Sequence, residues 1–240
     1  MKQLPPYSAS LPECVKEVRQ NSCLNNLLSR KAITSIPLKN SYRSHPVLTD
    51  IISKTLCDSE LKSSSSVEDR RMWKELKFPK PFDDIPLMIL DVPGTECRTP
   101  LQSWTNDEQN GAALKIAQKI QSHLPGRLTK LCYYNSILRD LRARKLSLPC
   151  YTVDSYMSRE TDLVLLLTTR TNTGLTEKTG RFFFDQNRLI VALTKAKEGV
   201  IVLDSQRLLE KFPLWKKLFS ELIKRIEIVS PEKFIGYLNR

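Results

Sequence analysis

Apolar residues follow two alternating patterns along the chain, and together they predict a sheet of parallel strands connected by helices. Short apolar runs predict strands at 86–92, 131–134, 150–154, 163–168 and 199–203. Between them, apolar residues recur every three or four positions over 106–123, 137–145 and 186–197, which predicts helices. The run from Leu163 to Leu167 has no polar position, as expected of a strand buried on both faces. This alternation predicts an α/β fold with a doubly wound, mainly parallel sheet and flanking helices.

Two further stretches have helical spacing outside this alternation. Apolar residues from Val47 to Leu56 follow Pro46, which is favoured in the first turn of a helix. Near the C-terminus, an apolar stripe from Phe212 to Ile226 has lysines and arginines largely off its face. We interpret this stretch as a helix packed across the sheet. A helix lying on a membrane surface has the same pattern and is the less favoured alternative.

One low-complexity stretch, Lys62 to Ser66, continues into charged residues and predicts an exposed loop. It divides the chain into three parts. Residues 1–61 form a largely helical lead-in, residues 62–81 a polar loop, and residues 82–240 the α/β lobe with its C-terminal helices.

The net charge of the chain indicates a binding partner. The chain has 38 Lys and Arg against 26 Asp and Glu, a net charge of +12, which favours a polyanionic partner. Nucleic acid, an anionic membrane surface and no partner at all remain open on charge alone. Six scattered cysteines and two histidines argue against a zinc or other metal site. Without an apolar run long enough for a bilayer or a secretory signal, we expect an intracellular protein, cytoplasmic or nuclear, with no membrane association.

Four segments contain residues that are suited to binding or catalysis. They are Lys2-Gln3-Leu4-Pro5-Pro6-Tyr7, Ser41-Tyr42-Arg43-Ser44-His45-Pro46, the stretch from Thr152 to Asp162, and the stretch from Phe184 to Lys197. In the second segment, Tyr42 offers a ring for stacking on a nucleobase, and Arg43 a planar fork for phosphate oxygens. Three of the segments also have a structural interpretation: a Pro-Pro turn for the first, a helix start with Arg43 in a salt bridge for the second, and an amphipathic helix for the fourth.

Taken in this order, the four segments resemble the C-terminal lobe of superfamily 1 helicases, in the branch that contains the RNA helicase of nonsense-mediated decay. The resemblance runs from the first residues to about Trp215 and implies a RecA-like second lobe of the P-loop NTPase type. It implies that Arg43, Lys195 and Gln3 face the phosphates of ATP as catalytic residues, the first two as arginine-finger-type cations. It further implies a nucleotide-binding role for Tyr42, Glu160 and Arg188. Nucleic-acid contacts are implied for Pro5, Pro6, Thr152, Asp154 and Ser155.

The chain departs from the family pattern at four positions. Met157 and Ser158 stand where the family has Gln and Gly, and Ile137 where it usually has Gln. A glycine at 158 would allow a positive φ or a close backbone approach, and Ser158 puts both in doubt. Lys195 stands at the second arginine finger, where lysine keeps the charge but lacks the bidentate fork.

No Gly-x-x-x-x-Gly-Lys-Ser/Thr sequence occurs in the chain. ATP and Mg²⁺ are therefore expected only with a complete N-terminal RecA-like lobe, and the chain alone is expected to be inactive as an ATPase. The sequence predicts the C-terminal lobe of an ATP-dependent RNA or DNA helicase. Its expected partners are single-stranded nucleic acid, with RNA favoured, and an N-terminal lobe or partner protein. The alternative is a catalytically decayed module that binds RNA or protein.

Overall fold

The computed structural model describes residues 27–28, 30–31, 33–34, 36–136, 148–176, 178–225 and 227–239. Five strands form the central sheet in the order β3 (Leu87–Asp91), β9 (Ala196–Asp204), β8 (Thr161–Leu167), β6 (Leu128–Cys132) and β7 (Cys150–Thr152). Every neighbouring pair is parallel. The predicted α/β fold with a parallel sheet is confirmed, and each strand overlaps an apolar run in the sequence.

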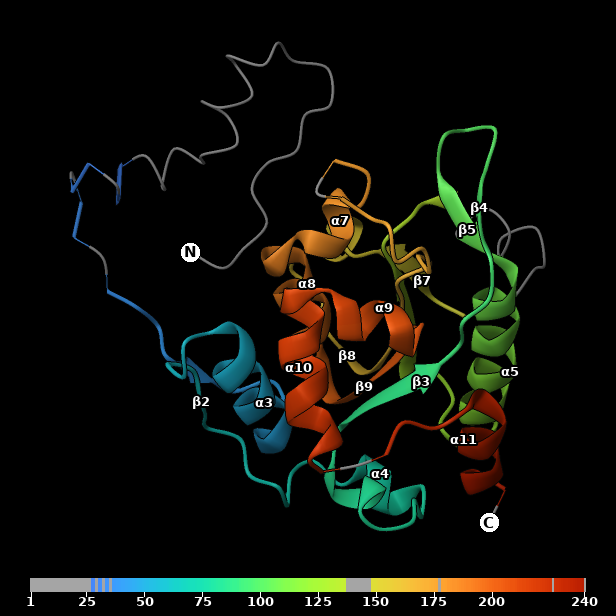
Figure 1. Cartoon of the computed structure of the whole chain (residues 1–240). Coiled ribbons are helices and arrows are strands. Elements are labelled where there is room, and N and C mark those ends of the chain that lie inside the picture. The colour runs from blue at the N-terminus through green and yellow to red at the C-terminus, as the bar shows by residue number, and fades with distance from the viewer. Residues whose placement is uncertain are drawn as a thin grey trace.

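Helices cover both faces of the sheet (Figure 1). One face carries α5 (Asp107–His123) and α11 (Pro231–Tyr237), which contact each other. The opposite face carries α3 (Pro46–Leu56), α8 (Gln186–Leu193), α9 (Gln206–Lys211) and α10 (Pro213–Ile223). The sheet is thus the middle layer of three, and all residues from Leu163 to Leu167 in β8 are fully buried.

The apolar stripe of α10 faces the protein. Trp215, Leu218 and Leu222 are fully buried, and the helix contacts α3 and α9. The Trp215 indole Nε1 donates a hydrogen bond of 3.0 Å to the carbonyl of Phe183 in α7 (Arg181–Phe184). The alternative of a membrane-surface helix is therefore wrong, because the stripe is already buried by packing. Within the described residues, no helix is both long and apolar enough to cross a bilayer.

Short elements occupy the stretch expected to be a polar loop. Lys62–Ser63 form β2, which pairs in parallel with β1 (Asn40–Ser41), and Met72–Glu75 form α4. Trp73 of α4 is 2% exposed and donates from Nε1 to the carbonyl of Glu198 in β9. This stretch is therefore attached to the sheet rather than exposed throughout. The remaining short elements are η1 (Phe82–Asp84), η2 (Asp154–Tyr156) and the antiparallel hairpin of β4 (Glu96–Arg98) and β5 (Trp104–Asn106).

Several predicted boundaries were wrong, among them those of the strand expected at 131–134, which is β6 at Leu128–Cys132. The helix predicted over 186–197 ends at Leu193, and β9 begins at Ala196. Pairing with β8 explains this difference, because Thr161 donates its backbone N–H to the carbonyl of Lys195 and Ala196 is in register with Thr161. The strand expected at 150–154 ends at Thr152, where η2 follows. The helix expected over 137–145 lies outside the described residues.

Candidate functional site

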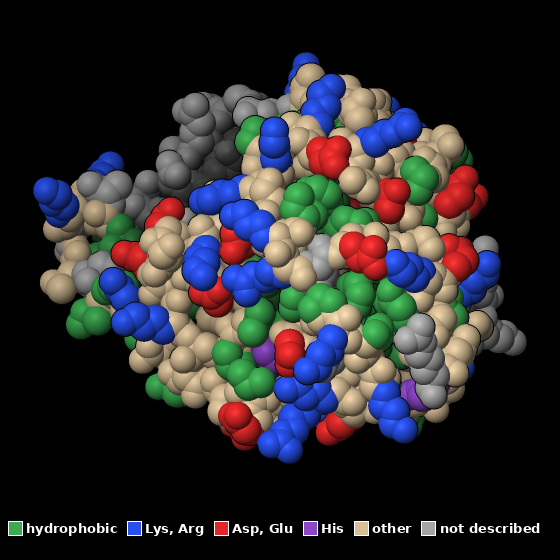
Figure 2. All heavy atoms as spheres, turned by 60° about the horizontal axis from the view of Figure 1, so that its bottom comes forward, with side chains coloured by type: hydrophobic (Ala, Val, Ile, Leu, Met, Phe, Trp, Pro, Cys, Tyr) green, Lys and Arg blue, Asp and Glu red, His purple; other side chains and the backbone are tan. Residues whose placement is uncertain are grey.

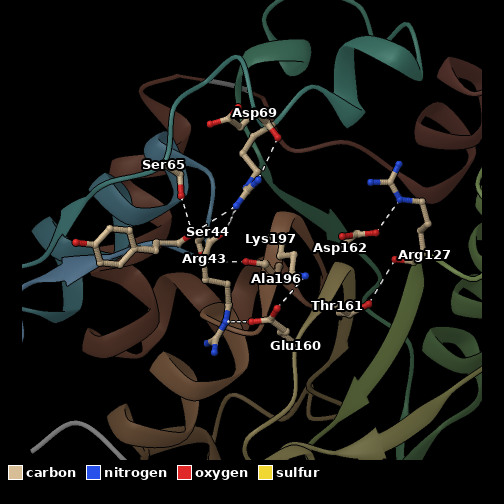
Figure 3. Close-up of polar contacts among 12 residues, drawn as sticks. Arg43, Ser44, Ser65, Asp69, Arg127, Glu160, Thr161, Asp162, Ala196 and Lys197 are labelled. Atoms are coloured by element: carbon tan, nitrogen blue, oxygen red, sulfur yellow. Dashed lines mark hydrogen bonds and ion pairs between the residues drawn. The ribbon is translucent and has the colours of Figure 1, made fainter.

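A cluster of charged side chains lies at the amino ends of β8 and β9 (Figure 3). Arg43 donates from Nε to Glu160 Oε2 at 2.8 Å and from Nη1 to the carbonyl of Thr194 at 3.0 Å. Lys197 Nζ lies 2.8 Å from the other carboxylate oxygen, Glu160 Oε1. Glu160 directly precedes β8, and Lys197 is the second residue of β9. We call Arg43, Glu160, Lys195 and Lys197 the cation cluster.

Backbone contacts hold the Arg43 turn against β9. Ser44 Oγ donates to the carbonyl of Ala196 at 2.8 Å, and the backbone N–H of His45 donates to the carbonyl of Lys197 at 2.8 Å. Arg70 Nη2 donates to the carbonyl of Arg43 at 2.9 Å. The first two contacts join residues 152 positions apart and the third joins residues 27 positions apart, so the position of Arg43 is determined by the fold rather than by its own loop.

His45 begins α3 as its N-cap. Its Nδ1 accepts a hydrogen bond of 3.1 Å from the backbone N–H of Val47, which requires that nitrogen to be unprotonated. Burial, with a smaller contribution from Arg70, lowers the pKa of His45 to about 4. The helix that follows Arg43 is therefore capped by a neutral imidazole at neutral pH.

The cation cluster has an excess of positive charge. Hydrogen bonds from Lys197 and then Arg43 lower the pKa of Glu160 to about 2, so its carboxylate is ionised. Lys195 is 8% exposed, and burial followed by the charge of Arg43 lowers its pKa, while Glu160 opposes this shift. Three cations surround one carboxylate, and an anionic ligand would relieve their mutual repulsion. Figure 2 shows that Lys and Arg side chains alternate with Asp and Glu over the face that comes forward from the bottom of Figure 1.

The structure thus brings together three residues predicted to act on a nucleotide. Arg43, Glu160 and Lys195 come from three segments and meet at one edge of the sheet. Tyr42, the residue before Arg43, is 72% exposed, so its ring is accessible to a ligand. Gln3, Pro5, Pro6 and Ile137 lie outside the described residues.

Arg188 does not join the cation cluster. It lies in the first turn of α8, whereas Lys195 follows the end of that helix. Its Nε and Nη2 donate to both carboxylate oxygens of Asp154 at 3.0 and 2.9 Å, and Nη1 donates to Asp185 at 3.2 Å. The Arg188 side chain is 6% exposed. Arg188 therefore anchors the turn after β7, and its guanidinium is occupied by two carboxylates.

The three residues predicted to contact nucleic acid lie together at the carboxyl end of β7. Thr152 Oγ1 donates to Ser155 Oγ at 2.9 Å and accepts from the backbone N–H of Ser155 at 3.2 Å. Asp154 and Ser155 are exposed. Within the described part of the chain, no group of three or more His, Cys, Asp or Glu could hold a metal ion.

The segment from Asp154 to Glu160 connects the two ends of the sheet. It begins beside Arg188 at the carboxyl end of β7 and finishes at the amino end of β8. Ligands of open parallel sheets usually bind at the carboxyl ends of the strands, but Glu160 lies at the amino end of β8, because the segment crosses to start the next parallel strand. Ser158 in this segment has a φ of 59°, so the position keeps the positive φ that its departure from glycine put in doubt.

Sequence reasoning missed Lys197 and Arg70. A signal for Lys197 was present, because Lys195 and Lys197 are separated by one residue, and side chains two apart lie on the same face of a strand. The helix predicted over these residues concealed that pattern. Arg70 lay in the predicted polar loop, and nothing in its local sequence indicated a contact with the Arg43 turn.

Comparisons with known proteins agree on one class. A family model described as an AAA domain matches residues 19–207. Regulator of nonsense transcripts 1 from Dictyostelium discoideum is 32% identical over 195 residues, which cover 75% of this chain and 14% of that protein. An uncharacterized ATP-dependent helicase from Methanocaldococcus jannaschii is 25% identical over 244 residues, covering 96% of this chain and 34% of that protein. The chain thus spans between 14% and 34% of the length of these two curated relatives.

Among solved structures, the C-terminal domain of a possible DNA helicase from Lactobacillus plantarum aligns with a TM-score of 0.43 and 11% sequence identity. The alignment covers 74% of this chain and 94% of that domain.

Proposed function

The chain belongs to the AAA domain family of the kind that forms the C-terminal lobe of superfamily 1 helicases, and on this premise we propose that it supplies one wall of an ATP-binding cleft and part of a track for single-stranded nucleic acid. The observation that carries the proposal is the cation cluster. Arg43 and Lys195, which lie 152 positions apart in the sequence, are held beside Glu160 with an excess of positive charge.

Three residues of the cation cluster, and the neighbouring Tyr42, have a role in this proposal. Arg43 and Lys195 neutralise negative charge on the phosphates of ATP while the γ-phosphoryl group is transferred to water and ADP leaves, as arginine-finger-type cations do. Glu160 accepts hydrogen bonds from the sugar, and the exposed Tyr42 ring stacks on the base. The side chains of Arg43 and Glu160 are 37% and 43% exposed, so a nucleotide can reach them.

The phosphate cradle and the ligands of Mg²⁺ belong to a second, N-terminal lobe in this proposal. This assignment rests on the sequence, since the 240 residues contain no Gly-x-x-x-x-Gly-Lys-Ser/Thr loop. Mg²⁺ supplies charge neutralisation at the phosphates when it is bound there. The resemblance assigns the γ-phosphate contact to Gln3 as well, which lies outside the described residues.

Nucleic acid binds at the opposite end of the sheet, near Thr152 and Ser155, with Pro5 and Pro6 completing the track. Single-stranded RNA is the favoured partner, because similar proteins are named regulators of nonsense transcripts. The net charge of +12 supports a polyanionic partner of either kind.

The test is ATP hydrolysis stimulated by single-stranded RNA, in a protein where a complete N-terminal lobe precedes residue 1. We expect Arg43→Ala to lower kcat by about 10³-fold or more. The matched control is Arg127→Ala, because Arg127 also lies at the amino edge, where its Nε binds Asp162 at 2.7 Å. Equal losses in both variants, or none in Arg43→Ala, would contradict the proposal.

Lys195→Arg tests the second cation in the same assay. Restoring a planar fork at this position should raise kcat, because a bidentate contact stabilises the transferring phosphoryl group better than an ammonium does. If Lys195→Arg leaves kcat unchanged while Arg43→Ala abolishes turnover, Lys195 does not face the γ-phosphate.

A second candidate function is a module that binds RNA or protein without turnover. It is favoured by Met157, which is 39% exposed at a position where the family has a polar glutamine, and by Lys195 in place of an arginine finger. The same assay separates the two functions. RNA binding that weakens with salt, together with no ATP hydrolysis in the two-lobe protein, would support the second.

A further inference from the structure

A cavity of about 800 Å³ opens at the carboxyl ends of β6 and β7, away from the cation cluster. We call it the aromatic cavity. Its volume falls within the range of small-molecule and cofactor sites, roughly 300–1,000 Å³. Five of its lining residues are aromatic, and they come from four different parts of the chain: Trp104, Tyr133, Tyr134, Tyr151 and Phe182.

Buried cations hold two of these rings in place. The guanidinium carbon of Arg170 lies 4.0 Å from the centre of the Trp104 ring, and that of Arg188 lies 3.9 Å from the centre of Phe182. Arg170 is 2% exposed and bound to Glu96 at 2.9 Å, and Arg188 is fixed by its two carboxylates. The rings are therefore oriented before any ligand arrives, which reduces the entropy cost of binding.

The rings are also accessible. Trp104, Tyr151 and Phe182 are half-buried. Tyr133 and Tyr134 are buried, and Tyr134 packs on Phe182 at a centroid distance of 5.6 Å. Half-buried rings around an open volume are suited to a flat ligand that stacks on one of them.

Polar groups lie around the rings at the edge of the cavity. Asn135 is exposed and offers both a carbonyl oxygen and an amide NH₂, the combination that pairs with the edge of a nucleobase. Arg159 is exposed, with its guanidinium 5.0 Å from the centre of the Tyr151 ring, where it can bind a phosphate. Asp154 also lines the cavity, but its carboxylate is neutralised by Arg188.

We propose that the aromatic cavity binds an unpaired base of a single-stranded nucleic acid by stacking, while Arg159 binds the adjacent phosphate. This inference rests on the proposed function, since it names how the strand is held. Thr152 and Ser155 line the same cavity, so the backbone contacts implied for them and the stacked base belong to one site. Aromatic platforms of this kind bind single strands with little sequence preference.

The experiment compares two fluorescent decamers of equal length and charge, oligo(A) RNA and an oligonucleotide with every base removed. Their binding to the 240-residue chain is measured by fluorescence anisotropy at several salt concentrations. We expect oligo(A) to bind about 10- to 100-fold more tightly than the abasic strand, because stacking contributes only when bases are present.

Variants assign this difference to the cavity. Tyr151→Leu and Phe182→Leu keep apolar volume but remove a π-face, and each should reduce the preference for oligo(A), whereas Tyr151→Phe should retain it. Arg159→Ala should lower the salt slope of log K by about one unit, and Tyr151→Leu should leave that slope unchanged. The control is Ile223→Ala on α10, a 48% exposed apolar position outside the cavity. Thermal unfolding confirms that each variant is folded.

The outcomes separate the cavity from the proposed function. Equal, salt-sensitive binding of both decamers would overturn the cavity and leave nucleic-acid binding in place. No binding of either decamer would overturn both. A third outcome concerns free AMP. If AMP displaces oligo(A) at a concentration near the Kd of AMP, and Tyr151→Leu weakens the binding of AMP as much as the binding of oligo(A), the ligand is a free nucleotide. The strand proposal is then overturned.

Discussion

Ser158 has a φ of 59°, which places a residue with a Cβ in the left-handed region of backbone space. This conformation costs a residue other than glycine roughly 1–2 kcal/mol. The surrounding segment imposes it, because Glu160, two residues later, is held by Arg43 and Lys197 at the amino end of β8. The backbone geometry is thus set by its neighbours even though the residue is a serine.

Ser158→Gly should therefore stabilise the protein. Relief of the left-handed strain outweighs the added entropy of glycine in the unfolded chain, and we expect a gain of about 0.5–1 kcal/mol in the free energy of unfolding. Urea denaturation measures it. Ser155→Gly is the control and should lower stability, because Ser155 Oγ bonds both Thr152 Oγ1 and the carbonyl of Thr152. A loss in Ser158→Gly larger than in the control would show that its side chain makes contacts worth more than the strain.

His45 gives the protein a specific sensitivity to acid. Its pKa in the folded state is about 4, below the ordinary value of 6.5, because burial disfavours the imidazolium. Between these values the unfolded chain binds a proton that the folded protein does not. Stability from His45 is therefore complete above pH 6.5 and is lost as the pH falls towards 4, by at most about 1.4 kcal/mol per pH unit.

The variant His45→Asn separates this effect from other titrations. Asparagine caps helices well and does not titrate, so it should keep the start of α3 while removing the loss between pH 6.5 and 4. The measurement is the difference in unfolding free energy between wild type and variant across this range. A constant difference would mean that His45 carries the same charge in both states. Glu160, whose pKa is lowered to about 2, is present in both proteins and cancels in the comparison.

At the scale of elements, the apolar pattern predicted the strands most clearly where both faces are buried, whereas the edge strand β7 is only half-buried. β8 is the clearest case, with five successive residues fully buried. The pattern could not place the boundary between α8 and β9, since residues 194–197 are Thr-Lys-Ala-Lys and their single apolar residue is compatible with either element. Only pairing with Thr161 decides between them, and pairing partners 35 residues away are not visible in a local window.

The sequence predicted which residues form the candidate site, but it did not predict at which end of the sheet they lie. The resemblance to helicases singled out Arg43, Glu160 and Lys195, and the rule for parallel sheets pointed to the carboxyl ends of the strands. The cation cluster instead lies at the amino ends, because the segment from Asp154 crosses to the start of β8. Lys197 became visible only once β9 was known to begin at Ala196.

Two glycines test how closely the elements pack. A Cβ at Gly199 in β9 would lie within 2.7 Å of two carbons of the Trp73 indole, whereas a Cβ at Gly111 in α5 would meet nothing within 4 Å. Gly199→Ala should therefore force α4 away from the sheet and lower the free energy of unfolding by about 1–3 kcal/mol. Gly111→Ala should raise it by about 0.5–1 kcal/mol, because alanine is the better helix former.

Chemical denaturation of both variants measures this contrast. Gly199→Ala should also shift the tryptophan emission to longer wavelength, as Trp73 becomes less buried, while Gly111→Ala should leave the emission unchanged. Equal effects of the two substitutions would show that α4 can move away from β9 without cost.

At the scale of the whole molecule, two sites of different chemistry lie at opposite ends of one sheet. The cation cluster lies at the amino ends of β8 and β9, and the aromatic cavity at the carboxyl ends of β6 and β7. One segment reaches both, since Asp154 is bound by Arg188 beside the cavity and Glu160 is bound by Arg43 in the cluster. A parallel sheet fixes the distance between these ends, so contacts at one site do not depend on side chains at the other.

This arrangement predicts a division of kinetic effects in the two-lobe protein. Arg43→Ala should lower kcat for RNA-stimulated ATP hydrolysis about 10³-fold or more and leave RNA affinity unchanged, because in the proposed function Arg43 contacts the nucleotide and not the strand. Tyr151→Leu should raise the RNA concentration needed for half-maximal stimulation about 10-fold and leave kcat at saturating RNA unchanged, because stacking contributes to binding of the strand and not to phosphoryl transfer. Steady-state kinetics over a range of RNA concentrations, with direct binding by anisotropy, measure both. If Tyr151→Leu lowered kcat at saturating RNA as much as Arg43→Ala does, the two ends of the sheet would act as one catalytic unit, with the segment from Asp154 to Glu160 as the connection between them.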